Sequence, residues 1–170
     1  MSRLARSASL VLACVVVQVT VLPHLRLLGV VADLGLVLAA AVAFHDGPES
    51  AALAGFAAGL GFDLFVETPL GMSALAYALT GYLVGVVQAS LLRAPGWIPP
   101  VLGGAAGLVG GGLFVLAAAL AGTEEVLGSH TARVVALAAL YDALLAPFVF
   151  PLVRRAVTTP RDRGATWSLR

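Results

Sequence analysis

Six long runs of apolar residues, separated by short turns, constrain this 170-residue chain more than any other feature. Hydrophobic residues make up 60% of the chain and charged residues only 11%, whereas a soluble globular domain has roughly 45–50% apolar and about 25% charged residues. This composition excludes a water-soluble domain, a disordered chain and a nucleic-acid-binding protein. A transmembrane helix needs about 17–25 mostly apolar residues, so the length suffices for six helices with short loops. The sequence therefore predicts an integral membrane protein.

The turns that hold proline, glycine and charge divide the apolar sequence into predicted helices. Their expected ranges are about 7–22, 30–44, 50–66, 70–92, 98–121 and 131–153. Residues 1–153 thus form a compact all-α transmembrane bundle, and residues 154–170 form an arginine-rich tail. The second and third runs are short for a bilayer. Five helices, with one pair merged or re-entrant, are therefore the alternative to six.

The placement of arginine predicts the orientation of the bundle. If both termini are cytoplasmic, the cytoplasmic side holds eight of the ten arginines, and the outer side holds only Arg26 and Arg133. Positive residues near helix ends resist translocation, which favours this orientation. Both termini on one side require an even number of helices, in agreement with six.

Residues that enzymes and metal sites use are scarce. Cys14 is the single cysteine, which excludes an internal disulfide and a multi-cysteine metal site. His24, His45 and His130 fall in different loops with no ligand spacing. The nucleophile elbow, the zinc-protease motif and the phosphate-binding loop are absent. The sequence predicts neither catalysis nor a cofactor or metal.

Several polar residues interrupt the apolar runs. Asp33, Asp63 and Asp142 are the acidic ones, and a carboxylate at a helix centre costs roughly 2.5–3.5 kcal/mol on insertion scales. Each must face the bundle interior, pair with a donor or be protonated. We expect Asp142 to be the deepest, with a partner that the sequence does not identify, and Tyr141 beside it to be buried too. Gln18 is expected to form a hydrogen bond across helices, with a ligand role as the alternative.

Asp33 has two interpretations. It is either the N-terminal residue of the second helix, where the positive end of the helix dipole favours it, or a functional carboxylate.

Glycine spacing is the strongest local signal. Lipid tails give helices no hydrophobic reason to associate, so close approach at small residues must supply the contact. We expect these glycines to pack helices within the bundle, with a surface for another membrane protein as the alternative. Asp63 shares a helical face with two of them, which predicts a tight interhelical contact with a hydrogen bond rather than a proton relay. The spaced glycines are Gly55 and Gly59, Gly81 and Gly85, and Gly103, Gly107 and Gly111.

The order of several motifs resembles the rod-shape-determining MreD family. Residues 55–63, GFAAGLGFD, resemble that family's glycine–phenylalanine, glycine–leucine and aspartate signature. The last helix is similar through YDALL at residues 141–145, although the family more often has asparagine where this chain has Asp142. Further matches at the family's spacing are Gln18, Leu28-Gly29, Asp33-Leu34, Pro69-Leu70-Gly71, Tyr77, Gly81-Tyr82-Leu83, Pro147 and Pro151.

This resemblance implies a non-enzymatic component of the cell-elongation (rod) machinery in the bacterial inner membrane. Its partners would be an MreC-like bitopic membrane protein, membrane lipid and, indirectly, MreB, RodA and a class B penicillin-binding protein. The implied fold is similar to the substrate-binding subunit of energy-coupling-factor transporters. We hypothesise that the glycine faces receive a partner's single membrane helix. The expected packing or interface residues are Gly55, Phe56, Gly59, Asp63, Gly71, Gly81 and Gly85.

The alternative function is a small-molecule-binding membrane subunit of a vitamin-type transporter. Its pocket would lie near the outer ends of the second, third and sixth helices, with Asp33 and Asp63 as ligand contacts. The outer loops lack the cluster of aromatic and polar residues that such a pocket needs.

Overall fold

The computed structural model describes residues 3–26, 28–66, 69–90, 97–120, 122 and 129–157. Over these residues the chain forms six α-helices and a short 3₁₀ turn, which confirms the all-helical prediction. The arginine-rich tail beyond residue 157 lies outside them. The elements are α1 (Arg3–Thr20), η1 (Leu22–His24), α2 (Leu34–Asp46), α3 (Pro48–Asp63), α4 (Met72–Ala89), α5 (Ile98–Leu120) and α6 (Ser129–Val157).

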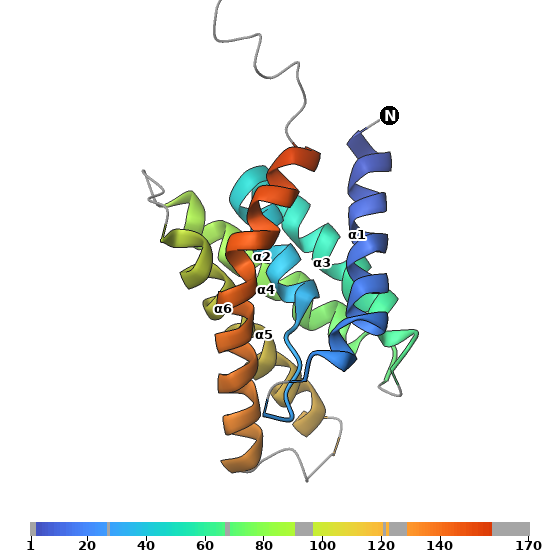
Figure 1. Ribbon diagram of the computed structural model, residues 1–170, viewed down its shortest axis with the longest axis vertical. Coiled ribbons are helices and arrows are strands. Elements are labelled where there is room, and N and C mark those ends of the chain that lie inside the picture. The colour runs from blue at the N-terminus through green and yellow to red at the C-terminus, as the bar shows by residue number, and fades with distance from the viewer. Residues whose placement is uncertain are drawn as a thin grey trace, which may run out of the picture.

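The helices run alternately up and down the bundle. Among the described residues, four helices are long and apolar enough to cross a membrane: α1, α4, α5 and α6. The remaining two, α2 and α3, have only 13 and 16 residues. Helix α1 begins and α6 ends at the upper end of the bundle in Figure 1, where the turn from α2 to α3 also lies.

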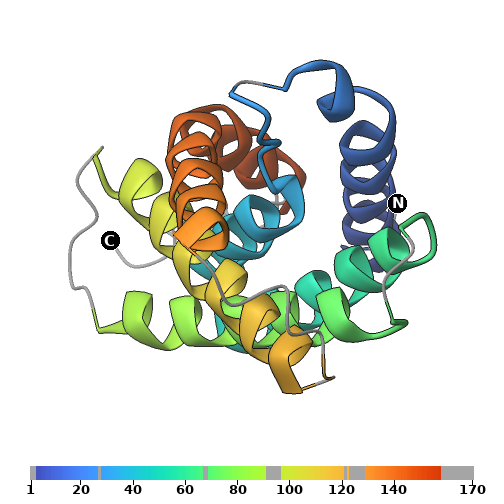
Figure 2. The ribbon, with the colours of Figure 1, turned by 90° about the horizontal axis from the view of Figure 1, so that it is seen from below.

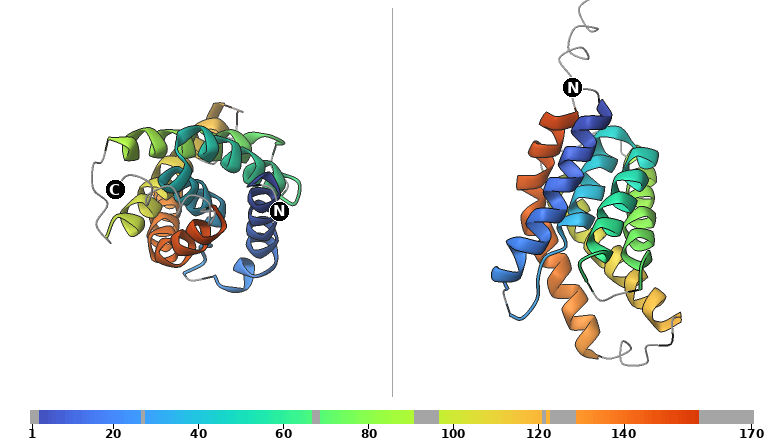
Figure 3. Two further views of the ribbon diagram at one scale, coloured as in Figure 1. Left: turned by 90° about the horizontal axis from the view of Figure 1, so that it is seen from above. Right: turned by 90° about the vertical axis from the view of Figure 1, so that its right-hand side faces the viewer.

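Helix α2 is the core of the molecule. Its nine consecutive residues 35–43 are all buried, and it contacts each of the other five helices. A helix that is apolar on every side belongs in the interior, and the run of leucine, valine and alanine in α2 meets this condition. Figure 2, and the view from above in Figure 3, show α2 enclosed by the other helices.

The start of α2 differs from the prediction. The expected start was near Val30, but the helix begins at Leu34. Leu28 and Gly29 have φ angles of 55° and 81°, in the left-handed region that turns the chain. Figure 1 shows the chain then running back up into the bundle, so that α2 begins about halfway along it. Non-helical backbone at this depth is tolerated where protein covers it.

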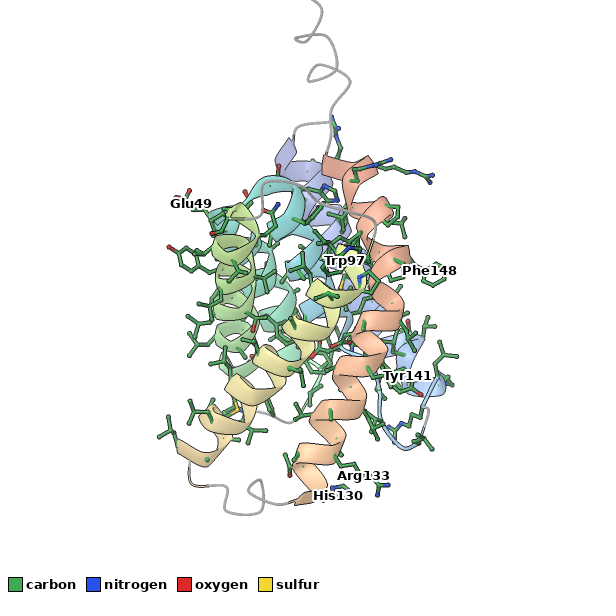
Figure 4. All side chains as sticks on the ribbon, turned by 90° about the vertical axis from the view of Figure 1, so that its left-hand side faces the viewer. Glu49, Trp97, His130, Arg133, Tyr141 and Phe148 are labelled. Atoms are coloured by element: carbon green, nitrogen blue, oxygen red, sulfur yellow. The ribbon has the colours of Figure 1, made fainter. Side chains whose placement is uncertain are left out.

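One exposed face of α6 indicates where the membrane lies. Arg133 and Arg155 are both exposed, and their separation of 22 positions along the helix corresponds to about 33 Å at 1.5 Å per residue. The hydrocarbon core of a bilayer is about 30 Å thick. Between Arg133 and Arg154, the residue before Arg155, the large exposed side chains are apolar: Leu140, Leu144, Phe148 and Leu152. The two arginines therefore mark the expected edges of the bilayer, with Asp142 near its middle; Figure 4 shows Arg133 at one end of the helix.

Candidate functional site

Four polar side chains from different segments converge on the start of α2, and we call them the polar centre. They bind the backbone or the side chains of residues 32–36. The members of the polar centre are Gln18 of α1, Asp33 before α2, Tyr77 of α4 and Asp142 of α6.

Asp33 is the N-cap of α2. Its Oδ1 accepts hydrogen bonds from the backbone N–H groups of Gly35, at 3.1 Å, and Leu36, at 3.3 Å. Its Oδ2 accepts the hydroxyl hydrogen of Tyr77. Because the first N–H groups of a helix have no partner within the helix, a side-chain oxygen there stabilises it. Of the two interpretations of Asp33, the helix N-terminal one is confirmed.

Gln18 joins α1 to the same segment by two hydrogen bonds. Its Nε2 donates to the carbonyl oxygen of Ala32 at 3.1 Å, and its Oε1 accepts from the N–H of Leu34 at 2.8 Å. The interhelical hydrogen bond expected of Gln18 is present, and its partners are backbone groups at the start of α2.

Asp142 is fully buried, with 0% of its surface exposed. Its Oδ1 accepts a hydrogen bond from the backbone N–H of Asp33 at 2.7 Å, which supplies the partner that the sequence could not identify. Its Oδ2 has no hydrogen-bond partner among the described residues. The neighbouring Tyr141 is only half-buried, so the expectation that it is buried was wrong. Tyr141 lies between Arg133 and Phe148 along α6 in Figure 4.

A small cavity adjoins the polar centre. Its volume is about 10 Å³, which is on the order of the space that one water molecule needs. It is lined by Cys14, Val15, Gln18, Gly35, Ala58, Phe62 and Tyr77.

Asp63 forms a second buried polar contact, between the end of α3 and the start of α4. Its carboxylate accepts hydrogen bonds from the N–H groups of Gly71 at 2.8 Å and of Ser73 and Ala74 at 3.3 Å each. Gly71 is the N-cap of α4 and offers no side chain for this purpose. Asp63 therefore caps α4 from the neighbouring helix, in agreement with the expected tight contact and hydrogen bond.

The glycines of α3 lie directly against the backbone of α4. A Cβ atom added at Gly55 would lie 2.5 Å from the carbonyl oxygen of Tyr77, and one at Gly59 would lie 2.5 Å from the Cα of Ala74. Real Cβ atoms essentially never come so close to backbone, so only glycine permits this approach.

The glycines of α4 fit the backbone of α3 in the same way. A Cβ atom at Gly81 would lie 2.7 Å from the carbonyl oxygen of Ala51, and one at Gly85 would lie 2.5 Å from the Cα of Pro48. The two antiparallel helices thus interlock along their whole length.

Helices α5 and α6 use glycine similarly. A Cβ atom at Gly103 would lie 2.6 Å from the Cβ of Ala146, and one at Gly107 would lie 2.5 Å from Oδ2 of Asp142. The orphan oxygen of Asp142 is therefore packed against the backbone of α5.

This packing corrects the hypothesis that the glycine faces receive a partner's helix. The faces of Gly55, Gly59, Gly81 and Gly85 are covered by each other's helices, so none of them is free for another protein. Phe56, on the other side of α3, is instead 48% exposed.

Sequence reasoning did not predict the roles of Tyr77 and of the segment before α2. Tyr77 lies 44 residues from its partner Asp33, so no local spacing connects the two. The backbone groups of Ala32 and Leu34 carry no sequence signal at all.

The fold and the polar centre define a polytopic helical membrane protein whose buried polar side chains bind its own backbone. Among the described residues, no group of three His, Cys, Asp or Glu side chains could hold a metal ion. The family model described as rod shape-determining protein MreD matches residues 3–156, and the chain belongs to this family. Members of this family are shape-determining proteins and are not known as enzymes. Comparisons with curated proteins and with solved structures gave no match.

Proposed function

We propose that this protein is a non-enzymatic component of the bacterial rod complex that binds an MreC-like bitopic membrane protein. Through that partner it would act indirectly with MreB and help control peptidoglycan synthesis by RodA and a class B penicillin-binding protein. It would lie in the inner membrane with both termini cytoplasmic. The family match over residues 3–156 is the observation that carries this proposal.

The outer face of α3 is the surface that best suits a partner's membrane helix. Because α4 covers the glycine face, a partner must approach α3 from the opposite side. Exposed apolar side chains follow one another there at spacings of three and four residues, which places them in one stripe of the helix. The stripe consists of Leu53, Phe56, Leu60 and Leu64.

Single-cysteine cross-linking tests this surface. The native Cys14 is buried, and a Cys14→Ala background leaves no other cysteine in the chain. In that background we expect Phe56→Cys to form a disulfide with a cysteine placed in the membrane helix of the MreC-like partner. Phe148→Cys on α6 is the matched control, because Phe148 is also an exposed phenylalanine.

Two results would contradict the proposal at different levels. Equal cross-linking from Phe56→Cys and Phe148→Cys would exclude α3 as the specific surface. Failure of the unsubstituted chain to co-purify with the MreC-like protein in mild detergent, when both are expressed together, would contradict the function itself.

The transporter alternative gains no support from the cavity beside Gln18 and Tyr77. Its volume of about 10 Å³ is far below the roughly 300–1,000 Å³ of a small-molecule site. The polar side chains on its wall are already bonded to the protein.

A further inference from the structure

The Oδ2 atom of Asp142 is a buried oxygen without a hydrogen-bond partner among the described residues, and it lies near the middle of the membrane-spanning bundle. The side chain is fully buried. Buried polar atoms are normally bonded, and each exception has a physical cause.

No positive charge faces this carboxyl group from the described segments. The titratable groups that interact with it are the Asp33 carboxyl before α2 and the Tyr77 hydroxyl of α4. Helix α5 presents the backbone of Gly107 and no ionisable side chain. The chain contains no lysine.

The arginines of α6 are too far away to compensate the charge. Arg133 and Arg154 lie nine and twelve residues from Asp142, which is about 14 and 18 Å along the helix axis. Each of them is placed toward an edge of the bilayer.

The space around Oδ2 distinguishes the possible partners of this oxygen. A metal ion would need several further oxygen ligands, yet the backbone of Gly107 packs directly against Oδ2. A proton needs no additional volume. An ionised carboxylate in an apolar interior costs far more free energy than a neutral carboxyl with one unpaired hydroxyl.

We propose that Oδ2 of Asp142 binds a proton, so that a neutral carboxylic acid at the centre of the bundle holds α6 against the start of α2. The Oδ1 atom of this acid accepts the N–H of Asp33. Release of the proton gives a carboxylate and a free H⁺, and leaves two negative charges, at Asp33 and Asp142, beside one peptide group. Their repulsion would separate α6 from α2, so the contact is a proton-dependent one. This inference is independent of the proposed function.

Infrared difference spectroscopy of the full chain in mild detergent at neutral pH tests the proposal. Wild type minus Asp142→Asn should show the carbonyl band of a protonated carboxyl group, shifted by deuterium exchange. Wild type minus Asp63→Asn is the matched control, because Asp63 is also buried and this substitution leaves the Asp142 carboxyl in place, so the band assigned to Asp142 should cancel in this spectrum. A carboxylate band in the Asp142 difference spectrum would overturn the proposal.

Thermal unfolding gives a second readout. Asparagine has the shape of the neutral acid and no charge, so Asp142→Asn should fold and keep the wild-type melting temperature at neutral pH. As the pH is raised, the wild type should lose stability before the variant does. Identical alkaline profiles, or an Asp142→Asn protein that fails to fold, would contradict the proposal.

Discussion

At the scale of single residues, the aspartates within the bundle accept hydrogen bonds from backbone N–H groups. Asp33 caps its own helix, and Asp63 caps α4 from the end of α3. Both helix starts leave N–H groups without intrahelical partners, and within a bilayer no water can satisfy them. The carboxylates therefore stabilise two helix starts inside an otherwise apolar bundle.

The hydroxyl of Tyr77 should contribute measurably to this arrangement. Tyr77→Phe removes the donor to Asp33 but keeps the ring against Gly35. We expect the free energy of unfolding in mixed detergent to fall by about 0.5–1.5 kcal/mol, the usual net value of one hydrogen bond. Tyr82→Phe is the control on the same helix, since Tyr82 is 47% exposed. An equal effect of the two substitutions would contradict the assigned role of Tyr77.

At the scale of elements, α3 and α4 are held together by backbone proximity. Four glycines, two from each helix, lie along the contact, and Asp63 closes it at one end. Close approach increases the dispersion contacts between the helices, which is the attraction available where lipid is as apolar as the side chains.

A single added methyl group should disturb this contact. In Gly59→Ala the new Cβ would meet the Cα of Ala74 at 2.5 Å, so one backbone must shift. Overpacking of this kind costs about 1–3 kcal/mol, and we expect a lower free energy of unfolding.

Gly112→Ala on α5 is the matched control, because nothing lies within 4 Å of the added Cβ. There alanine should stabilise the helix by up to about 1 kcal/mol. Destabilisation by both substitutions would show that the measured loss does not come from the α3–α4 contact.

At the scale of the whole molecule, a short α2, buried over residues 35–43, is enclosed by helices that face lipid. Because residues 28–33 run back into the bundle, α2 does not have to span the bilayer. Its 13 residues cover about 20 Å at 1.5 Å per residue. The outer helices thus set the position in the membrane, and α2 holds them together from inside.

The orientation proposed for the bundle predicts the accessibility of two arginine positions. In a Cys14→Ala background, Arg133→Cys should react with a membrane-impermeant thiol reagent in cells whose inner membrane is intact. Arg155→Cys should react only after that membrane is permeabilised, because it lies at the opposite end of α6. The reverse pattern would show that the termini are not cytoplasmic.

The sequence by itself determined the membrane class, the six helices and the internal position of the glycines as the favoured interpretation. It did so because apolar run length, proline and glycine punctuation and small-residue spacing act locally. It also offered a helix start as one of two interpretations of Asp33, and it predicted a tight contact for Asp63 because Asp63 shares a helical face with Gly55 and Gly59.

Only the tertiary structure decided which segments meet. The pairing of Asp142 with the N–H of Asp33, across 109 residues, depends on the return of the chain into the bundle before α2. The mutual covering of the glycine faces of α3 and α4 likewise depends on which helices become neighbours. Backbone N–H and C=O groups are the same in nearly every residue, so a sequence pattern does not show which of them will accept or donate a hydrogen bond. The fold alone brings these groups within hydrogen-bond distance of the polar side chains.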